Sequence, residues 1–364
     1  MSSGREPASG LNPTEVAARG PAPRSADSLK QRRKRLPWPK NREFRILAID
    51  GGGIKGVFPA AFLAGLEERY LGGKPVTRYF DLIAGTSTGG IIALGLGAGL
   101  PAARLRDLYI NRGGEVFPPT RLGRLGVLGR GAMSYVLYRY NRAALSRLLQ
   151  ESFGSLRLGQ SSARLCVPAM EGLYGEVFVY KTPHHPDYHL DGAKLMATVG
   201  EATSAAPTFF QPLRDGSGYV LVDGGVWANN PTMIALTEAL SCFDVSRDQV
   251  RILGLGCGTA RRRIGRWKIR LGGKLIWWDL ILAAMDLQSQ NANGQAGLLI
   301  GADRLLRIEP PTNAKPIALD DWRRAAAELP AAAEAALGTR GEEVAKQFLG
   351  RRALPYDTAD DAAL

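Results

Sequence analysis

The stretch at residues 79–99, YFDLIAGTSTGGIIALGLGAG, constrains the fold more than any other part of the chain. Two apolar runs flank the turn Gly85-Thr86-Ser87-Thr88-Gly89, and this order predicts a strand, a sharp turn and a helix. In such a G-x-S-x-G turn the serine lies at the tip, while Gly85 and Gly89 let neighbouring backbone pass close by. We therefore expect a buried α/β crossover with Ser87 as a candidate nucleophile. A Gly-rich turn with no catalytic role is the alternative.

A second glycine-rich turn precedes the first. The apolar run Phe44–Ile49 predicts a strand, and DGGGIKG, residues 50–56, leads from it into a helix. Gly51, Gly53 and Gly56 fit G-x-G-x-x-G, but a dinucleotide site needs an acid about 20 residues further on, where this chain has GGKP. The run does not end in Gly-Lys-Ser/Thr, so it is not the phosphate-binding loop of a nucleoside triphosphatase. The consecutive glycine N–H groups instead suit an oxyanion, so the two turns predict one site between neighbouring strands.

A third turn of this kind follows the expected strand at residues 219–222, where the chain reads Asp223-Gly224-Gly225. Asp223 at the end of a strand could reach Ser87 directly, and an ordinary Asp-Gly turn is the alternative. The last histidine is His189, so the order Ser, Asp, His of α/β-hydrolase triads is absent. A carboxylate with a reference pKa of about 3.9 is a poor base unless burial raises that value, which predicts slow or gated turnover.

The composition is that of a globular α/β protein of 364 residues with 45% hydrophobic residues. Cys166, Cys242 and Cys257 lie far apart in apolar segments, which predicts neither a disulfide framework nor a zinc site and fits a reducing compartment. All three histidines lie in a segment whose two prolines predict a loop and not the helix of a zinc motif, so we expect no metal. We expect no signal peptide and no transmembrane span.

The formal charge of +13 is concentrated in residues 1–45 and in residues 261–274, which hold seven Lys/Arg and no acid. Solvated basic segments are one interpretation, and attraction to anionic lipid or nucleic acid is the other. We expect no specific nucleic-acid site. A Trp-containing apolar helix at residues 275–287 comes after the second basic cluster, and whether 261–287 contacts membrane or is buried stays open.

The remaining elements are predicted from apolar periodicity. We expect strands at residues 165–169, 176–180, 249–257 and 304–308, and helices at residues 101–111, 194–206, 275–287, 319–337 and 342–349. The predicted domain organisation is a disordered basic leader at 1–42, a catalytic domain at 43–312 and a C-terminal helical extension at 313–364 packed on that domain. An irregular surface loop is expected at 117–134.

Taken together and in this order, the three turns resemble the signature of the patatin-like phospholipases. The resemblance implies a three-layer α/β/α fold with a mostly parallel central sheet. It also implies Ser87 as nucleophile and Asp223 as its dyad partner, with Gly51, Gly52 and Gly53 as oxyanion donors. Lys55 stands where the family often has Arg, which keeps the charge and loses the fork of donors.

The stretches FDLIAGTSTGGIIALGLGAG, YKTPHHPD, ATSAAPTFF and LVDGGVWANNP are similar to a narrower bacterial group, the antiphage patatin-like phospholipases that a cyclic oligonucleotide activates. This resemblance implies an enzyme with no cofactor that idles until it binds a cyclic dinucleotide such as cGAMP. It would then hydrolyse membrane phospholipids at the inner face of the cell membrane. A constitutive lipase, a non-enzymatic basic membrane or nucleic-acid-binding protein on a hydrolase fold, and a homo-oligomer all remain open.

Overall fold

The structure is a computed structural model that describes residues 33–118, 138–258, 280–311 and 316–356. Its strands form a single sheet. They are β1 (Phe44–Ile49), β2 (Leu82–Gly85), β3 (Leu165–Glu171), β4 (Glu176–Lys181), β5 (Leu213–Arg214), β6 (Val220–Asp223), β7 (Val250–Leu255) and β8 (Leu305–Ile308).

The sheet order is β5-β6-β3-β2-β1-β7-β8, and β4 also pairs with β3. Strands β3, β2, β1, β7 and β8 run parallel, whereas β4 and β6 are antiparallel to β3 and β5 is antiparallel to β6. The prediction of a mostly parallel sheet is therefore confirmed. Its antiparallel part lies at the β3 side, where it positions one half of the candidate site.

Helices connect most of the strands, except β3 to β4 and β5 to β6, which follow each other directly. The helices are α3 (Val57–Leu71), α4 (Thr88–Gly97), α5 (Ala102–Val116), α7 (Ala143–Phe153), α8 (Met196–Thr203), α9 (Gly225–Ala228), α10 (Thr232–Cys242), α12 (Leu280–Ile300) and α13 (Trp322–Val344). Short 3-10 turns lie at Gly53–Gly56, Val76–Tyr79, Leu158–Gln160, Arg247–Gln249 and Ala302–Arg304, and a π-helical turn at Ala345–Leu349 extends α13.

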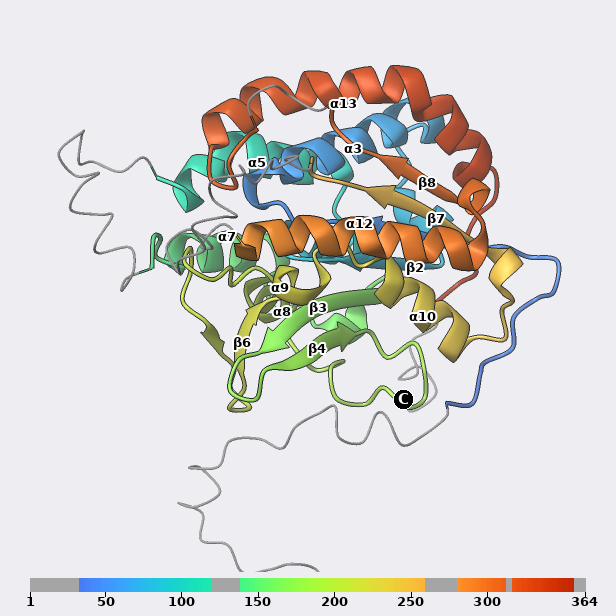
Figure 1. The fold of residues 1–364 in the computed structure, drawn as a ribbon, viewed down its shortest axis with the longest axis horizontal. Helices are drawn as coiled ribbons and strands as arrows, with labels where there is room; N and C mark the ends of the chain where they lie inside the picture. The colour runs from blue at the N-terminus through green and yellow to red at the C-terminus, as the bar shows by residue number, and fades with distance from the viewer. Residues whose placement is uncertain (1–32, 119–137, 259–279, 312–315, 357–364) are drawn as a thin grey trace, which may run out of the picture.

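Helices cover both faces of the sheet, which confirms the three-layer prediction (Figure 1). Strand β1 shows why: all six of its residues are buried, and alternate ones enter different cores. Leu47 and Ile49 belong to the core under α3, α4, α5 and α13, whereas Ile46 and Ala48 belong to the core under α10 and α12. An unbroken apolar strand is typical of a parallel sheet buried on both faces.

The expected leader at residues 1–42 differs from the structure in its last part. Residues 33–42 are described, and Leu36 bridges to Phe243 next to α10. The Trp38 ring is 7% exposed and packs against Phe44 at 4.7 Å between ring centroids. Composition alone does not indicate that Trp38 is buried, because the residues around it are polar and basic. Residues 1–32 lie outside the described part of the chain.

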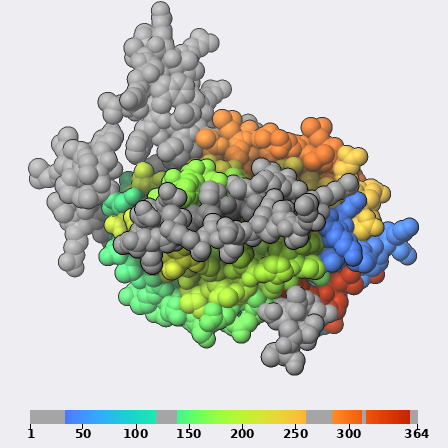
Figure 2. Space-filling view, turned by 90° about the horizontal axis from the view of Figure 1, so that it is seen from below, coloured from blue at the N-terminus to red at the C-terminus, as the bar shows by residue number. Residues whose placement is uncertain are grey.

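The C-terminal helices differ from the predicted pair at 319–337 and 342–349. A single helix, α13, runs through the expected break and packs along α3. Gly341 lies within this helix, and a Cβ there would lie 2.8 Å from the Tyr70 hydroxyl, so the glycine permits the close approach of α13 to α3. Figure 2 shows red residues near the C-terminus close to the blue residues at the start of the described chain. Arg45 of β1 contacts the last turn, where its Nη1 donates to the Phe348 carbonyl at 2.5 Å.

Helix α12 overlaps the end of the segment 261–287 and continues beyond it to Ile300. Ser289, Ala292 and Ala296 are buried, whereas Leu287 is 61% and Leu298 is 89% exposed. The basic cluster at 261–274 lies outside the described residues, as do the two tryptophans after it and most of the loop expected at 117–134. Within the described residues, no helix combines the length and apolarity needed to cross a bilayer.

Candidate active site

Ser87 lies at a strained turn between β2 and α4. Its backbone has φ 54° and ψ −119°, a left-handed φ that an L-residue adopts at a cost of about 1–3 kcal/mol. The flanking glycines permit this turn, because a Cβ on Gly85 would lie 2.0 Å from the Gly89 carbonyl oxygen and one on Gly89 would lie 2.2 Å from that of Ile49. The predicted strand, turn and helix are therefore present, and the serine stands at the N-terminus of α4.

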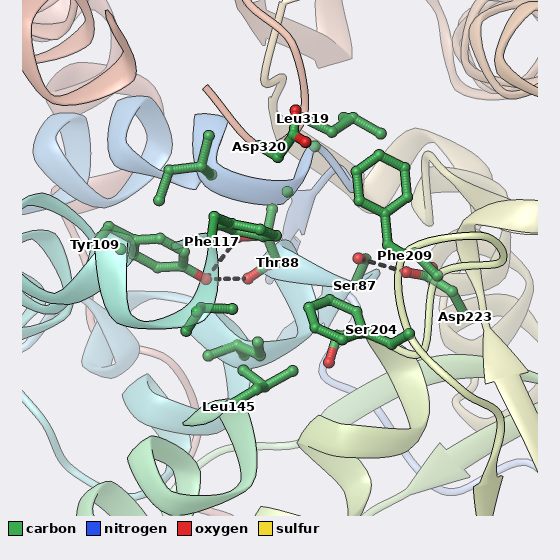
Figure 3. Close-up of a pocket in the computed structure, with 18 of the residues that line it drawn as sticks. Ser87, Thr88, Tyr109, Phe117, Leu145, Ser204, Phe209, Asp223, Leu319 and Asp320 are labelled. Atoms are coloured by element: carbon green, nitrogen blue, oxygen red, sulfur yellow. Dashed lines mark hydrogen bonds between the residues drawn. The ribbon is translucent and has the colours of Figure 1, made fainter. Parts of the chain in front are cut away.

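The hydroxyl of Ser87 donates a hydrogen bond to Asp223 Oδ2 at 2.7 Å. In Figure 3 the two side chains point toward one another beside Phe209. Their strands are not neighbours, since β3 lies between β2 and β6. Because β6 runs antiparallel to β3 and Asp223 pairs with Ala169, the end of β6 enters the site from the side opposite to β2.

Asp223 is 3% exposed. Burial raises the pKa of its carboxyl group to about 6, and the hydrogen bonds from Ser87 and from the Gly225 N–H limit that rise. The Gly225 N–H donates to Asp223 Oδ1 at 2.6 Å and so fixes the carboxylate plane. A Cβ on Gly224 would lie 2.3 Å from the Pro168 carbonyl oxygen, which explains glycine at that position. The buried carboxylate is thus a stronger base than an exposed aspartate.

The glycine loop differs from the prediction at one residue. The Gly51 N–H donates to the Asn229 carbonyl at 2.9 Å, so Gly51 does not fit the predicted role of oxyanion donor. Gly52 and Gly53 line the same cavity as Ser87, and within the described residues their N–H groups have no acceptor. Gly53 has φ 59°, and a Cβ on it would lie 2.4 Å from the Leu319 carbonyl oxygen. Two N–H groups therefore remain to bind an anion near Ser87.

A cavity of about 520 Å³ opens beside Ser87 and Asp223. In Figure 3, Tyr109, Phe117 and Leu145 lie to the left of the dyad, along the cavity. A cavity of this size and character accommodates a long apolar substrate group with its reactive end at the dyad. Its walls are mostly apolar and include Ile91, Leu105, Leu108, Phe117, Leu149 and Phe210.

A sequence model described as patatin-like phospholipase matches residues 47–236, which include all three glycine-rich turns. The chain belongs to the patatin-like phospholipase family. Three curated relatives are named cGAMP-activated phospholipase. The relative from Pseudomonas aeruginosa is 35% identical, and the match covers 67% of this chain and 72% of the relative. The relative from Escherichia coli is 35% identical, with 58% of this chain and 61% of the relative covered. The relative from Vibrio cholerae is 36% identical, with 59% of this chain and 64% of the relative covered. The predicted family, its fold and its class, the lipid-ester hydrolases, are confirmed.

Lys55, the departure from the common patatin-like pattern, has a structural partner. Its Nζ donates to the Gly258 carbonyl at 2.8 Å and joins the glycine loop to the chain after β7. Lys55 is not among the residues that line the cavity. Gly56 lies at the end of the same loop, where a Cβ would approach Thr88 Oγ1 to 2.2 Å, so the loop and the start of α4 are in contact.

Asp50, directly before the glycine loop, belongs to a buried ion cluster that no sequence motif indicates. Arg307 of β8 binds both carboxylate oxygens, with Nη1 at 2.9 Å from Oδ1 and Nη2 on Oδ2. Ser289 of α12 donates to Asp50 Oδ2 at 2.9 Å. The cluster fixes the first residue of the loop to two distant elements. Arg307 and Ser289 lie outside every motif, so no local pattern could have indicated them.

Thr203 is a second site residue that the three glycine-rich turns do not include. Its Oγ1 accepts a hydrogen bond from the Ser87 N–H at 2.9 Å and donates one to the Pro168 carbonyl at 2.6 Å. The hydroxyl therefore ties the nucleophile turn to β3, the strand between the two halves of the dyad. The small residues of ATSAAP at 202–207 are the sequence signal for this close packing.

The histidine loop forms a buried polar cluster away from the dyad. Ligand atoms of Cys166, His184 and Glu238 lie within 4.8 Å of one another. The Lys181 ammonium lies 2.5 Å from Glu238 Oε2. The carboxylate is therefore already paired with a cation, and we assign no metal here. Burial lowers the pKa of His184, while Lys181 and His184 lower that of Glu238 below its usual range.

Proposed function

We propose that this chain is a phospholipase that hydrolyses glycerophospholipid esters with Ser87 as nucleophile and Asp223 as base. The observation that carries the proposal is the 2.7 Å hydrogen bond from Ser87 Oγ to Asp223 Oδ2 at the side of an apolar cavity. The cavity suits the acyl chain of a lipid, and the strained turn exposes Oγ to a carbonyl group within it.

In the first step Ser87 Oγ attacks the ester carbonyl carbon, and its proton passes to Asp223 Oδ2. The C=O π electrons move to the carbonyl oxygen, and the N–H groups of Gly52 and Gly53 stabilise the resulting oxyanion. The N-terminus of α4 adds a partial positive charge beside the same site. With a pKa of about 6, the Asp223 carboxylate is ionised at neutral pH and is ready to accept the proton.

When the tetrahedral intermediate collapses, the bond to the glycerol oxygen breaks and Asp223 returns its proton to that oxygen. The lysophospholipid leaves, and the acyl group remains on Ser87 as an ester. Asp223 then takes a proton from a water molecule that attacks the acyl carbonyl, and it protonates Ser87 Oγ as the fatty acid is released. Protons balance over the cycle, and the mechanism requires no metal or cofactor.

We propose further that a cyclic dinucleotide such as cGAMP activates the enzyme, which then degrades the host's own membrane phospholipids in antiphage defence. The names of the three relatives support this. Action at the inner face of the cell membrane, by a peripherally bound protein, is part of the same proposal. The chain spans 61–72% of these relatives, and we assign no activator-binding residues.

We assign the catalytic domain to residues 43–312, with a basic leader at 1–42 and a C-terminal extension at 313–364. The extension contributes to the cavity wall through Ile317, Leu319 and Asp320. The Leu319 carbonyl accepts a hydrogen bond from the Ile54 N–H at 2.9 Å, next to the glycine loop. A chain cut at residue 312 would therefore lose part of the site as well as α13.

Fatty-acid release from phospholipid vesicles tests the proposal, with the purified chain alone, with cGAMP and with linear or cyclic mononucleotides. We expect release with cGAMP only, and none from the Ser87→Ala variant under any condition. Equal release without a nucleotide would identify a constitutive lipase. Binding to vesicles without any ester turnover, by a folded protein with cGAMP present, would contradict the enzymatic proposal.

A further inference from the structure

Arg139 lines the cavity that opens beside the dyad and has no role in the mechanism above. Its backbone N–H donates to the Thr208 carbonyl at 2.9 Å, and its guanidinium lies 5.3 Å from the centroid of the Phe209 ring. Phe209 is the aromatic residue beside Ser87 and Asp223 in Figure 3, and Arg139 lines the same cavity. The Arg139 guanidinium thus lies against the ring of Phe209, which itself lies beside Ser87 and Asp223.

Two arginines are among the described residues that line this cavity, and they differ in how firmly acids hold them. Arg112 binds Glu115 through two hydrogen bonds, at 2.7 and 3.0 Å, and Glu151 through a third at 2.5 Å. Arg139 donates one side-chain hydrogen bond within the described residues, from Nη1 to Asp320 at 2.6 Å, and its side chain is 53% exposed. Arg139 is therefore the cation that can turn toward a ligand.

Asp320 is arranged so that it can release Arg139. Its Oδ2 accepts from Arg139 Nη1 and also from the Tyr140 hydroxyl at 2.8 Å. The Asp320 side chain is 16% exposed, and a carboxylate this buried needs a hydrogen-bond donor. Tyr140 remains as that donor when the guanidinium moves away, so Arg139 can exchange one anionic partner for another without leaving a buried carboxylate unpaired.

We propose that Arg139 binds the phosphate group of the phospholipid substrate and that Asp320 competes with that phosphate for the guanidinium. The inference rests on the proposed phospholipase function. A guanidinium presents five N–H donors in a planar fork that matches two oxygens of a phosphate. In a glycerophospholipid the phosphate is separated from the nearest ester by the glycerol carbons alone, so one cavity can hold the ester at Ser87 and the phosphate at its polar edge.

Replacing Arg139 tests this with a pair of substrates that differ only in the phosphate headgroup. Phosphatidylglycerol and a diacylglycerol with the same acyl chains are compared as kcat/KM in mixed detergent micelles with saturating cGAMP. We expect R139Q to lower the ratio of phosphatidylglycerol to diacylglycerol hydrolysis by about 10-fold to 100-fold, the effect of one charge-assisted hydrogen-bonded pair. R139K should restore part of the ratio, because it keeps the charge and loses the fork.

The matched control is R147Q. Arg147 is a 58% exposed arginine paired with Glu115 that does not line the cavity, so its removal should leave the ratio unchanged. D320N keeps an acceptor for Tyr140 and removes the competing charge, so we expect it to raise the ratio several-fold. A fall in the ratio for D320N, or an unchanged ratio for R139Q with active protein, would overturn the assignment of Arg139 while leaving the phospholipase proposal intact.

A phosphodiester also occurs in a cyclic dinucleotide, and diacylglycerol hydrolysis separates the two sources. If Arg139 binds the lipid phosphate, the cGAMP concentration for half-maximal diacylglycerol hydrolysis is the same in wild type and R139Q. A large increase in that concentration would assign Arg139 to the nucleotide and overturn the inference. Wild-type protein inactive on both esters would contradict the proposed function itself.

Discussion

The Gly51 N–H is hydrogen-bonded to the Asn229 carbonyl at 2.9 Å, and this bond divides the triple-glycine turn into two parts. Gly51 anchors the turn to the residues just after Asp223-Gly224-Gly225, whereas Gly52 and Gly53 face the cavity. The anchor of one glycine thereby ties the two proposed oxyanion donors to the segment that follows Asp223.

Gly53→Ala should lower kcat by about 10²-fold to 10³-fold, the effect of losing an oxyanion donor. The added Cβ would lie 2.4 Å from the Leu319 carbonyl oxygen and would displace the loop. Gly72→Ala is the control, since Gly72 has φ 56° against φ 59° for Gly53 and nothing within 4 Å. It should lose about 1–2 kcal/mol of stability from the left-handed backbone and keep its activity. Equal losses of kcat in both variants would contradict the role of the loop.

The pH dependence should reflect the ionisation of Asp223. The base must be deprotonated, so kcat/KM should rise with pH and level off above the pKa of about 6. A pH–rate profile on a neutral soluble ester measures this without changing a lipid headgroup. A profile that is flat between pH 5 and pH 7 would show that a different group controls activity.

Ionisation of Asp223 should also affect stability, which should fall as the pH rises whereas kcat/KM increases. The folded-state pKa of Asp223 is raised above its unfolded value, so its contribution to stability is present at low pH and lost as the pH rises through about 6. Asp223→Asn does not titrate and keeps an oxygen for the Gly225 N–H. Relative to wild type, the variant should therefore gain on the order of 2 kcal/mol between pH 4 and pH 7. Urea unfolding at the two pH values measures this difference, and no gain would argue against a buried, raised-pKa carboxyl.

Arg307→Met should destabilise the protein by about 3–5 kcal/mol, because it leaves the buried Asp50 carboxylate without its cation. Asp50→Asn/Arg307→Met should lose less than Arg307→Met alone, since the buried charge at position 50 is removed together with its cation and only the more exposed Glu309 loses a partner. Chemical denaturation of the single and double variants gives the coupling between the two residues. Strictly additive losses would mean that the pair does not act as a unit at the start of the glycine loop.

Thr203→Val should lower kcat by about 10-fold while KM changes little, because the Ser87 N–H loses its acceptor and the nucleophile turn loosens. Valine fills the same volume, so packing is preserved. Thr203→Ser restores the hydroxyl and should restore most of kcat. A Val variant with wild-type kcat would remove Thr203 from the group of positioning residues.

Local patterns were sufficient for the parts of the site that depend on backbone shape. Ser87 at its turn and Asp223 at the end of a strand are predictable from glycine spacing, since each requires close backbone approach that only glycine allows. The partners contributed by distant elements could not be predicted in this way. Thr203, Arg307 and Asp320 come to the site through tertiary packing. Arg307 and Asp320 stand in no pattern, and the stretch ATSAAPTFF around Thr203 does not indicate its contact with Ser87.

The fold shows the same division. The buried strand β1 and its parallel neighbours are predictable from apolar runs, because a strand covered on both faces is apolar throughout. The position of β6 cannot be read from its sequence, since an antiparallel strand beyond β3 carries the same short apolar signal as a parallel one. The leader expected at 1–42 and the helix break expected after residue 337 differ from the structure, because composition reports polarity and not the surface against which residues such as Trp38 and Gly341 pack.

Covalent labelling by a fluorophosphonate, followed by peptide mass spectrometry, tests the central claim most directly, because the reagent reacts with an activated serine oxygen. We expect one phosphonate per chain on the peptide that contains Ser87, and no label on Ser87→Ala or Asp223→Ala protein that remains folded. Labelling of another serine together with undiminished phospholipid hydrolysis by Ser87→Ala would contradict the account.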